Sequence, residues 1–232
     1  MKTLLIVLIC TNAAAAALAQ KADSVSYYQK KGLEEKQARR FREAENNFAK
    51  AFQLSPANSD LLVEWGTVLI EQRRYREARE KFVRAEQAGN KNPVVIENLA
   101  TLSYNLRMWQ EAINYAQKMQ QAKIGKGTYF IIAKSYYELE NYGEALKNCE
   151  LAFKEEPKRA EIPYIAGRCF IEMSNYKRAA GCYEQAIERD SSNATWMYEA
   201  ALTYYAMPDD KKAIYWFESY MEIGRASCRE RV

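Results

Sequence analysis

Apolar and polar residues follow a pattern along this chain that is repeated six times. The repeated segment begins with FREAENNFAKAFQLSP at Phe41, and related segments begin at Tyr75, Trp109, Tyr142, Tyr176 and Asp210. The third residue after each start is alanine, and these alanines are separated by 34, 34, 33, 34 and 34 residues: Ala44, Ala78, Ala112, Ala145, Ala179 and Ala213. A constant period of this length indicates a stacked repeat array.

Each repeat contains two predicted helices. Residues four and seven positions after each alanine are mostly apolar, which places them with the alanine on one face of an amphipathic helix. Twelve positions before each alanine stands a small residue, which predicts a close crossing of an upstream helix: Gly32, Gly66, Ala100, Ala133, Gly167 and Ala201. A short polar turn such as Glu140-Asn141 joins the two helices, and Pro56 and Pro157 fall where the second helix is expected to end.

The period and these residues together resemble the tetratricopeptide repeat. The shared features are a small residue at repeat position 8, alanine at positions 20 and 27, an aromatic residue at 24 and proline at 32. The third and sixth repeats depart most from this pattern. The resemblance implies an all-α fold, a right-handed superhelical solenoid of about six helix-turn-helix units. The expected repeats are 25–58, 59–92, 93–125, 126–159, 160–193 and a truncated 194–222, within one array spanning 20–222.

Residues 1–19 have the composition of a secretory signal peptide. One lysine precedes an apolar run, and Ala17-Leu18-Ala19 supplies an A-x-A cleavage pattern. The run is too short to span a bilayer, so no membrane insertion is expected after cleavage. Lipid attachment at Cys10 is the alternative, although Ile9 is bulky where such sites favour a small residue.

Residues 223–232, IGRASCRERV, do not follow the repeat pattern. They resemble the in-frame translation of a common sequencing adapter, and we expect them to be a non-native tail; a genuine basic tail is the alternative. The sixth repeat then stops within its second helix without a polar cap, so we expect the natural protein to be longer.

Net charge argues against nucleic acid as a partner. The whole chain carries a formal charge of +4. Leaving out 1–19 and 223–232 removes four basic residues and one acidic residue, which leaves +1. The array therefore lacks the basic footprint typical of nucleic-acid binding.

Composition also argues against catalysis and metal binding. The chain has no histidine, which removes the most common general base and most zinc sites. No phosphate-binding or nucleophile motif occurs, so no enzymatic activity, cofactor or metal is expected.

Cys149, Cys169 and Cys182 form an odd set without C-x-x-C spacing. Buried free thiols are the favoured interpretation, and a Cys149–Cys169 disulfide is the alternative.

Surface recognition is then the expected function. Tetratricopeptide arrays present the first helices of their repeats on a concave face, chiefly through repeat positions 2, 5, 9 and 12. Here those positions predict a partner-binding groove made by Tyr104, Phe130, Lys134, Tyr137, Tyr164, Arg168, Tyr198 and Tyr205. Packing of these side chains against neighbouring helices is the competing interpretation. The carboxylate-clamp subtype is not expected, because its polar positions hold Gln29, Leu33, Val63 and Thr67.

The sequence therefore predicts a non-catalytic scaffold, exported to the periplasm or cell envelope of a bacterium, that binds a partner peptide or domain. The alternative is the N-terminal assembly arm of a longer envelope protein whose further residues bind the cell wall or carry an activity. The pattern gives no indication of an oligomeric state.

Overall fold

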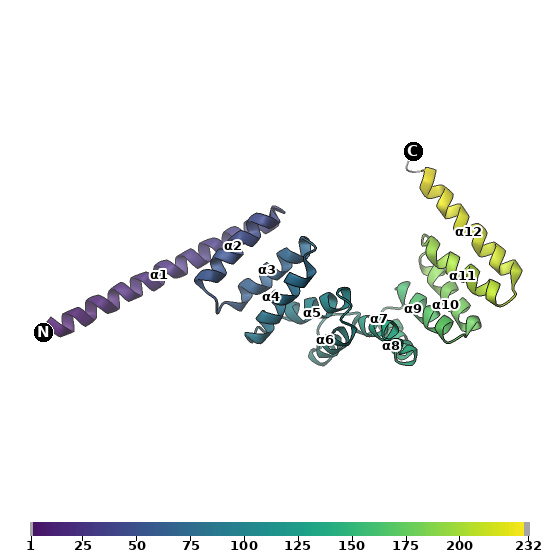
Figure 1. Cartoon of the computed structure of the whole chain (residues 1–232), viewed down its shortest axis with the longest axis horizontal. Coiled ribbons are helices and arrows are strands. Elements are labelled where there is room, and N and C mark those ends of the chain that lie inside the picture. Colours follow the sequence, from purple (N-terminus) through teal and green to yellow (C-terminus); the bar gives the residue numbers. More distant parts are fainter. Residues whose placement is uncertain (1, 230–232) are drawn as a thin grey trace. The chain divides into compact units, whose positions relative to one another are not determined.

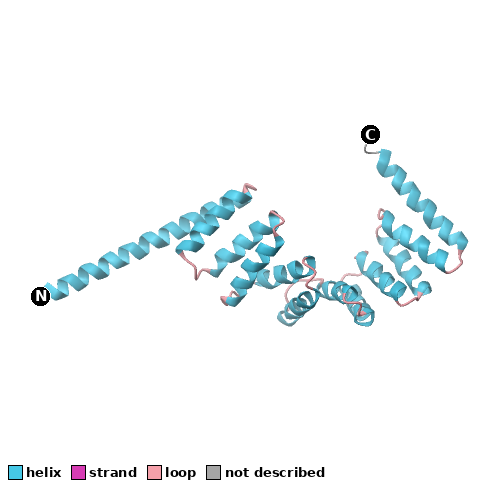
Figure 2. Cartoon of the chain, viewed as in Figure 1, coloured by secondary structure: helices cyan, strands magenta, loops and turns pink. Residues whose placement is uncertain are grey.

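A computed structural model describes the backbone of residues 2–229 and the side chains of residues 19–225. Throughout this described part the secondary structure is α-helical, with short connecting loops (Figures 1 and 2). The chain divides into two compact units, Met1–Leu106 and Arg107–Val232. The fold is an all-α helical repeat solenoid, as the sequence predicted.

Unit 1 contains five helices in the part that the structure describes, each packed against the next one along the chain. Their bounds are α1 Lys2–Gln37, α2 Phe41–Leu54, α3 Ser59–Glu71, α4 Tyr75–Gln87 and α5 Pro93–Asn105. Direct contact between α1 and α3 places the first helices of successive repeats in one layer.

Unit 2 contains seven helices in its described residues, again packed in chain order. Their bounds are α6 Trp109–Ala122, α7 Thr128–Glu138, α8 Tyr142–Glu155, α9 Glu161–Glu172, α10 Tyr176–Arg189, α11 Ala194–Ala206 and α12 Asp210–Arg229. Contact between α7 and α9 again joins first helices directly, and this layer carries the candidate site.

Five of the six hairpins share the backbone geometry of the turn between their helices. The second residue after the first helix adopts a left-handed conformation there, with φ between 57° and 60°: Arg39, Arg73, Arg107, Glu140 and Ser174. In two of the turns an asparagine follows, and Asn141 and Asn175 accept hydrogen bonds from the backbone N–H groups of Glu144 and Arg178. These caps satisfy amide groups that the first turn of a helix leaves unpaired.

Small residues make the close helix crossings inside the repeats. All twelve small positions identified from the sequence are buried: Gly32, Ala44, Gly66, Ala78, Ala100, Ala112, Ala133, Ala145, Gly167, Ala179, Ala201 and Ala213. A β-carbon at Gly66 would lie 2.7 Å from Cε2 of Phe82, and one at Gly167 would lie 2.8 Å from Cε1 of Tyr183. The missing side chain of the first helix therefore makes room for the aromatic ring of the second.

The core of unit 2 passes continuously from one repeat to the next. One cluster joins Ala145, Cys149 and Ala152 of α8 to Phe130 of α7 and Ile162 of α9. A second cluster joins α10 to α11 through side chains that include Tyr183 and Trp196. Each hairpin thus buries its apolar face against its neighbours, which is how a repeat array is stabilised.

The predicted terminal segments lie partly outside the described residues. The side chains of the predicted signal peptide, up to residue 18, and of residues 226–232 of the predicted tail lie outside the described residues. The described backbone of these segments belongs to α1 and α12. Ile223, the first residue of the predicted tail, packs against the α10–α11 cluster. Within the described residues, no helix is both long enough and apolar enough to cross a membrane.

Candidate functional site on the first helices of unit 2

Seven of the eight side chains predicted to form the groove belong to α7, α9 and α11 of unit 2. The eighth, Tyr104, is a half-buried residue of α5 in unit 1. Within unit 2 the helical spacing of the repeats brings the seven positions onto the first-helix layer, but their exposure differs widely.

Two of the predicted residues of α7 are almost completely buried. Phe130 and Tyr137 are 5% and 8% exposed. The Arg159 guanidinium lies 3.9 Å from the centre of the Phe130 ring, and the Lys134 ammonium lies 5.3 Å from it. Both aromatic rings therefore belong to the core cluster between α7 and α9 and have little surface to offer to a partner.

Tyr164 on α9 connects the layer to α11. Its ring stacks on Trp196 with 5.3 Å between the ring centres and 25° between the ring planes. Its hydroxyl donates a hydrogen bond to Oε1 of Glu199, at 3.0 Å. These two contacts hold α9 and α11 in a defined relation, so the Tyr164 side chain is part of the framework of the site.

Arg168 lies one turn further along α9 and has aromatic neighbours. Its guanidinium carbon is 4.5 Å from the centre of the Tyr137 ring and 5.9 Å from the centre of the Tyr164 ring. Among the described residues it makes no ion pair with a carboxylate. A half-buried cation held against two ring faces is favourable by itself and keeps its hydrogen-bond donors available.

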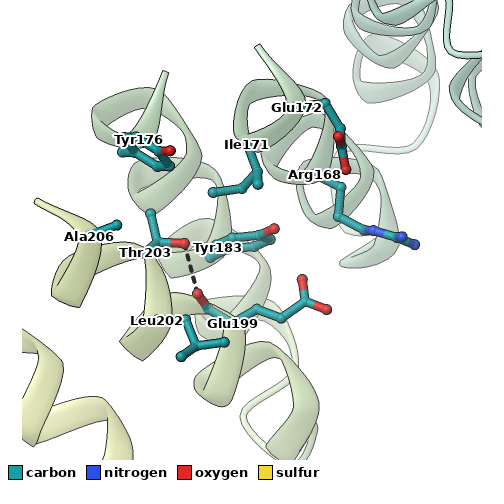
Figure 3. Close-up of a pocket in the computed structure, with 9 residues that line it drawn as sticks. All are labelled: Arg168, Ile171, Glu172, Tyr176, Tyr183, Glu199, Leu202, Thr203 and Ala206. Atoms are coloured by element: carbon teal, nitrogen blue, oxygen red, sulfur yellow. Dashed lines mark hydrogen bonds between the residues drawn. The ribbon is translucent and has the colours of Figure 1, made fainter. Parts of the chain in front are cut away.

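A groove of about 290 Å³ lies between α9 and α11. Arg168, Ile171 and Glu172 of α9 form one side and Glu199, Leu202, Thr203 and Ala206 of α11 form the other, with Tyr176 and Tyr183 of α10 completing the lining (Figure 3). The Thr203 hydroxyl donates to the backbone oxygen of Glu199 at 2.7 Å, so the threonine is satisfied within its own helix (Figure 3).

Burial raises the pKa of two tyrosine hydroxyls near this groove. Burial, with the Glu199 charge as a further cause, raises the pKa of Tyr164 to about 12. Burial also raises the pKa of Tyr183, again with a contribution from Glu199. Tyrosine hydroxyls are protonated at neutral pH, and that of Tyr164 donates a hydrogen bond to Glu199.

The outer surface of α11 is apolar and exposed. Tyr198, Leu202 and Tyr205 are 42%, 43% and 69% exposed. The Tyr198 ring also contacts Phe217 and Tyr220 of α12, with 5.9 Å and 5.4 Å between ring centres, so it is partly committed to its own hairpin. Leu202, which lines the groove, and Tyr205, three residues further along α11, are therefore exposed apolar side chains for which no ring contact is found among the described residues.

Repeat positions alone did not identify every groove residue. Glu199, Thr203 and Ala206 line the groove together with Leu202, because positions i, i+3, i+4 and i+7 share one face of α11. That spacing can be recognised in the sequence, and it would have added the residues on this face of α11 to the predicted groove. Tyr176 and Tyr183 belong to the second helix, and only the packing of α10 against α9 and α11 brings them to the groove.

The described residues provide no cluster of three or more histidine, cysteine, aspartate or glutamate side chains suited to hold a metal ion. The groove instead combines apolar surface with one arginine and two glutamates. Such a lining can bind apolar side chains of a ligand and orient them through a few polar contacts.

Family models and solved structures match the chain. The model described as tetratricopeptide repeat matches residues 30–93 and 167–227, which together make up more than half of the chain. The chain belongs to the tetratricopeptide repeat family. A second model, described as anaphase-promoting complex, cyclosome, subunit 3, matches residues 105–186. A comparison with curated protein sequences finds no match.

The solved structures that resemble this tetratricopeptide repeat protein share its fold at low identity. The crystal structure of YrrB, a TPR protein with an unusual peptide-binding site, is 18% identical with a TM-score of 0.60, covering 76% of this chain and 91% of YrrB. The structure of pilF from Pseudomonas aeruginosa is 14% identical with a TM-score of 0.63, covering 89% and 99%. The Cut9-Hcn1 hetero-tetramer of APC/C gives 14% identity and a TM-score of 0.58, covering 86% of this chain and 40% of that chain.

Proteins of this family generally mediate protein–protein interactions and are typically non-catalytic scaffolds. Their repeats bind protein or peptide partners. The coarse function predicted from the sequence therefore agrees with the family to which the chain belongs.

Proposed function

We propose that this protein is a non-catalytic scaffold that binds a segment of a partner protein on the first-helix surface of unit 2. The observation that carries the proposal is the pair of exposed apolar side chains on α11, Leu202 and Tyr205, beside the groove of about 290 Å³. Contiguous exposed apolar surface of this kind usually marks a contact site. Tyrosine is also among the residue types that contribute most to binding at interfaces.

The groove is well suited to a partner segment because its framework is already fixed. Tyr164 is held by Trp196 and Glu199, and Arg168 is held by two tyrosine rings. A preorganised surface loses less conformational entropy on binding than a flexible one. An apolar side chain of the partner then fills the groove, while Arg168 and the two glutamates orient the segment.

Site-specific cross-linking tests the binding surface. A photoreactive amino acid in place of Tyr205 is expected to capture the partner in cells, because position 205 lies beside the groove. The same amino acid in place of Tyr215, which is 58% exposed on α12, serves as the control and is expected to capture little of that partner. Equal capture from both positions would contradict the proposed surface.

We also propose that the chain is exported and acts in the periplasm or cell envelope, either alone or as the assembly arm of a longer envelope protein. The support is the composition of residues 1–19. The expected mature protein begins at Gln20, and intact-mass measurement of protein purified from the producing cell checks this. A mass that includes residues 1–19 would contradict export by cleavage.

A further inference from the structure

The two sides of α9 serve different surfaces. Arg168, Ile171 and Glu172 line the groove described above (Figure 3). Ile162, Ala166 and Phe170, spaced four residues apart, line a second pocket. Residues four apart share one face of a helix, and around the helix axis Arg168 lies about 200° from both Ala166 and Phe170. The pocket therefore opens on the other side of α9 from the groove. We call it the second-helix pocket, since α8 and α10 form its walls.

The second-helix pocket is larger than the groove and mostly apolar. Its volume is about 370 Å³, which is within the range of roughly 300–1,000 Å³ found for small-molecule sites. The wall from α8 includes Leu146, Cys149 and Phe153, and the wall from α10 includes Cys182. Burial raises the pKa of both thiols, so they remain neutral and behave as small apolar groups.

Two arginines of α10 flank this apolar surface. Arg178, Cys182, Gln185 and Arg189 follow a spacing of four, three and four residues, so they lie along one helical face, and the two arginines are separated by roughly 16 Å along the axis. The Arg178 guanidinium lies 5.6 Å from the centre of the Phe170 ring. The Arg189 guanidinium lies 5.2 Å from the centre of the Phe153 ring. Both of these phenylalanine rings line the pocket.

The charges around the pocket are unbalanced. Lys154 and Glu150 are the charged lining residues, and with the two flanking arginines they give three cations and one anion. Within the described residues, neither arginine nor Lys154 forms an ion pair. Arg189 donates to the backbone oxygens of Pro157 and Gln185. Among the described residues the Arg178 guanidinium lies near the Phe170 ring and makes no hydrogen bond or ion pair, so its donors remain available to a ligand.

We propose that the second-helix pocket binds a linear amphiphile with one anionic headgroup, of the chemical class of a medium-chain carboxylate. Its hydrocarbon chain lies along the apolar lining, and its carboxylate contacts Arg178. This site goes beyond the proposed function, because it lies on the other side of α9 from the partner groove and takes a small molecule.

The lining favours an alkyl chain over an extended peptide. A bound peptide needs partners for its backbone N–H and C=O groups. The polar lining side chains are Glu150, Lys154 and Gln185, and all of them are exposed at the rim. An alkyl chain needs no such partners, and its transfer from water into an apolar pocket is favourable.

Three ten-carbon probes test the proposal on the full-length protein: decanoate, decanol and decyltrimethylammonium, each below its micelle concentration. Cys182 is a built-in reporter, because it lines the pocket and is only half-buried. Decanoate is expected to slow alkylation of Cys182, as followed by mass spectrometry of its tryptic peptide. Decanol is expected to protect more weakly and decyltrimethylammonium least, because the latter is repelled by the flanking cations.

Two variants locate the ligand. Arg178→Gln is expected to weaken decanoate binding about three- to fivefold, as for an exposed ion pair, and to leave decanol binding unchanged. Ala166→Phe fills the pocket and is expected to abolish binding of both probes, with helicity measured by circular dichroism as the folding control. Leu202→Ser in the partner groove is the matched control and is expected to leave decanoate binding unchanged.

Three outcomes would overturn the proposal. The first is equal protection by all three probes, which would show that charge plays no part. The second is decanoate binding that persists in a folded Ala166→Phe variant. The third is protection of Cys182 by the cross-linked protein partner but by none of the probes, which would assign the pocket to a protein. Because the comparison of the three probes needs no substitution, a variant that failed to fold would leave the test intact.

Discussion

Replacing Leu202 and Tyr205 together by serine is expected to weaken binding of the partner by about 100-fold, which corresponds to ~2.7 kcal/mol. Both side chains are exposed on α11, at 43% and 69%, and Leu202 lines the groove. Removing them takes away the apolar surface that the partner is proposed to cover. Titration of the purified partner by calorimetry measures the change.

The choice of these two residues follows from the contacts of the other groove residues. The rings of Tyr137 and Tyr164 both contact Arg168. Tyr164 also stacks on Trp196 and donates a hydrogen bond to Glu199. Alanine at either position would remove packing inside unit 2, and a loss of binding would then have two explanations. Among the described residues, Leu202 and Tyr205 have no such ring or hydrogen-bond contacts, so we expect their replacement to leave the thermal unfolding midpoint nearly unchanged.

A matched pair on α12 provides the control. Ile214 and Tyr215 are 57% and 58% exposed and have the same combination of an aliphatic and a phenolic side chain. Serine at both is expected to change the affinity less than twofold. Retained affinity in the α11 variant, or an equal loss in the α12 variant, would move the binding surface away from the groove.

The second large effect is expected in the core of unit 1, where Phe82 of α4 packs on Gly66 of α3. Phe82 is fully buried, and Phe82→Ala is expected to cost about 3–5 kcal/mol through lost burial and the resulting cavity. Gly66→Ala places a β-carbon 2.7 Å from the ring and is expected to cost about 1–3 kcal/mol through overpacking. Chemical denaturation of the full chain measures both free energies.

The double variant tests whether the two positions act through one contact. Once the Phe82 ring is absent, the alanine at 66 has room, so the combined cost is expected to be smaller than the sum of the single costs. Gly181→Ala is the control, because a β-carbon there meets nothing within 4 Å. It is expected to stabilise α10 by about 0.5–1 kcal/mol through helix propensity. If the free-energy costs of the substitutions at positions 66 and 82 simply added, the Phe82 ring and Gly66 would not act through one contact.

Much of the fold could be predicted from the sequence, because repeat proteins are dominated by local and nearest-neighbour contacts. The 34-residue period located the helix pairs, and the small residues marked the crossings that Phe82 and Tyr183 complete. Stability then depends on contacts between helices that follow one another along the chain. A single sequence with a clear period contains that information.

The site was harder to predict from the sequence, because the exposure of its side chains depends on how neighbouring repeats pack. Repeat positions alone placed Phe130, Tyr137 and Tyr205 on one groove, yet their exposed fractions are 5%, 8% and 69%. The difference arises because α9 covers the rings on α7, whereas the outer surface of α11 has no such cover among the described residues. The assignment of partner-contact residues therefore remains a prediction, and the structure directs its test to Leu202 and Tyr205.

The sequence by itself determined the fold class and the kinds of residue on each helical face, since both follow from periodicity. Only the tertiary structure decided which side chains remain exposed, that Arg168 lies against two tyrosines, and that Arg178 and Arg189 flank an apolar pocket. These features involve side chains from different helices, and their distances depend on how the helices pack. A one-dimensional pattern does not contain those distances.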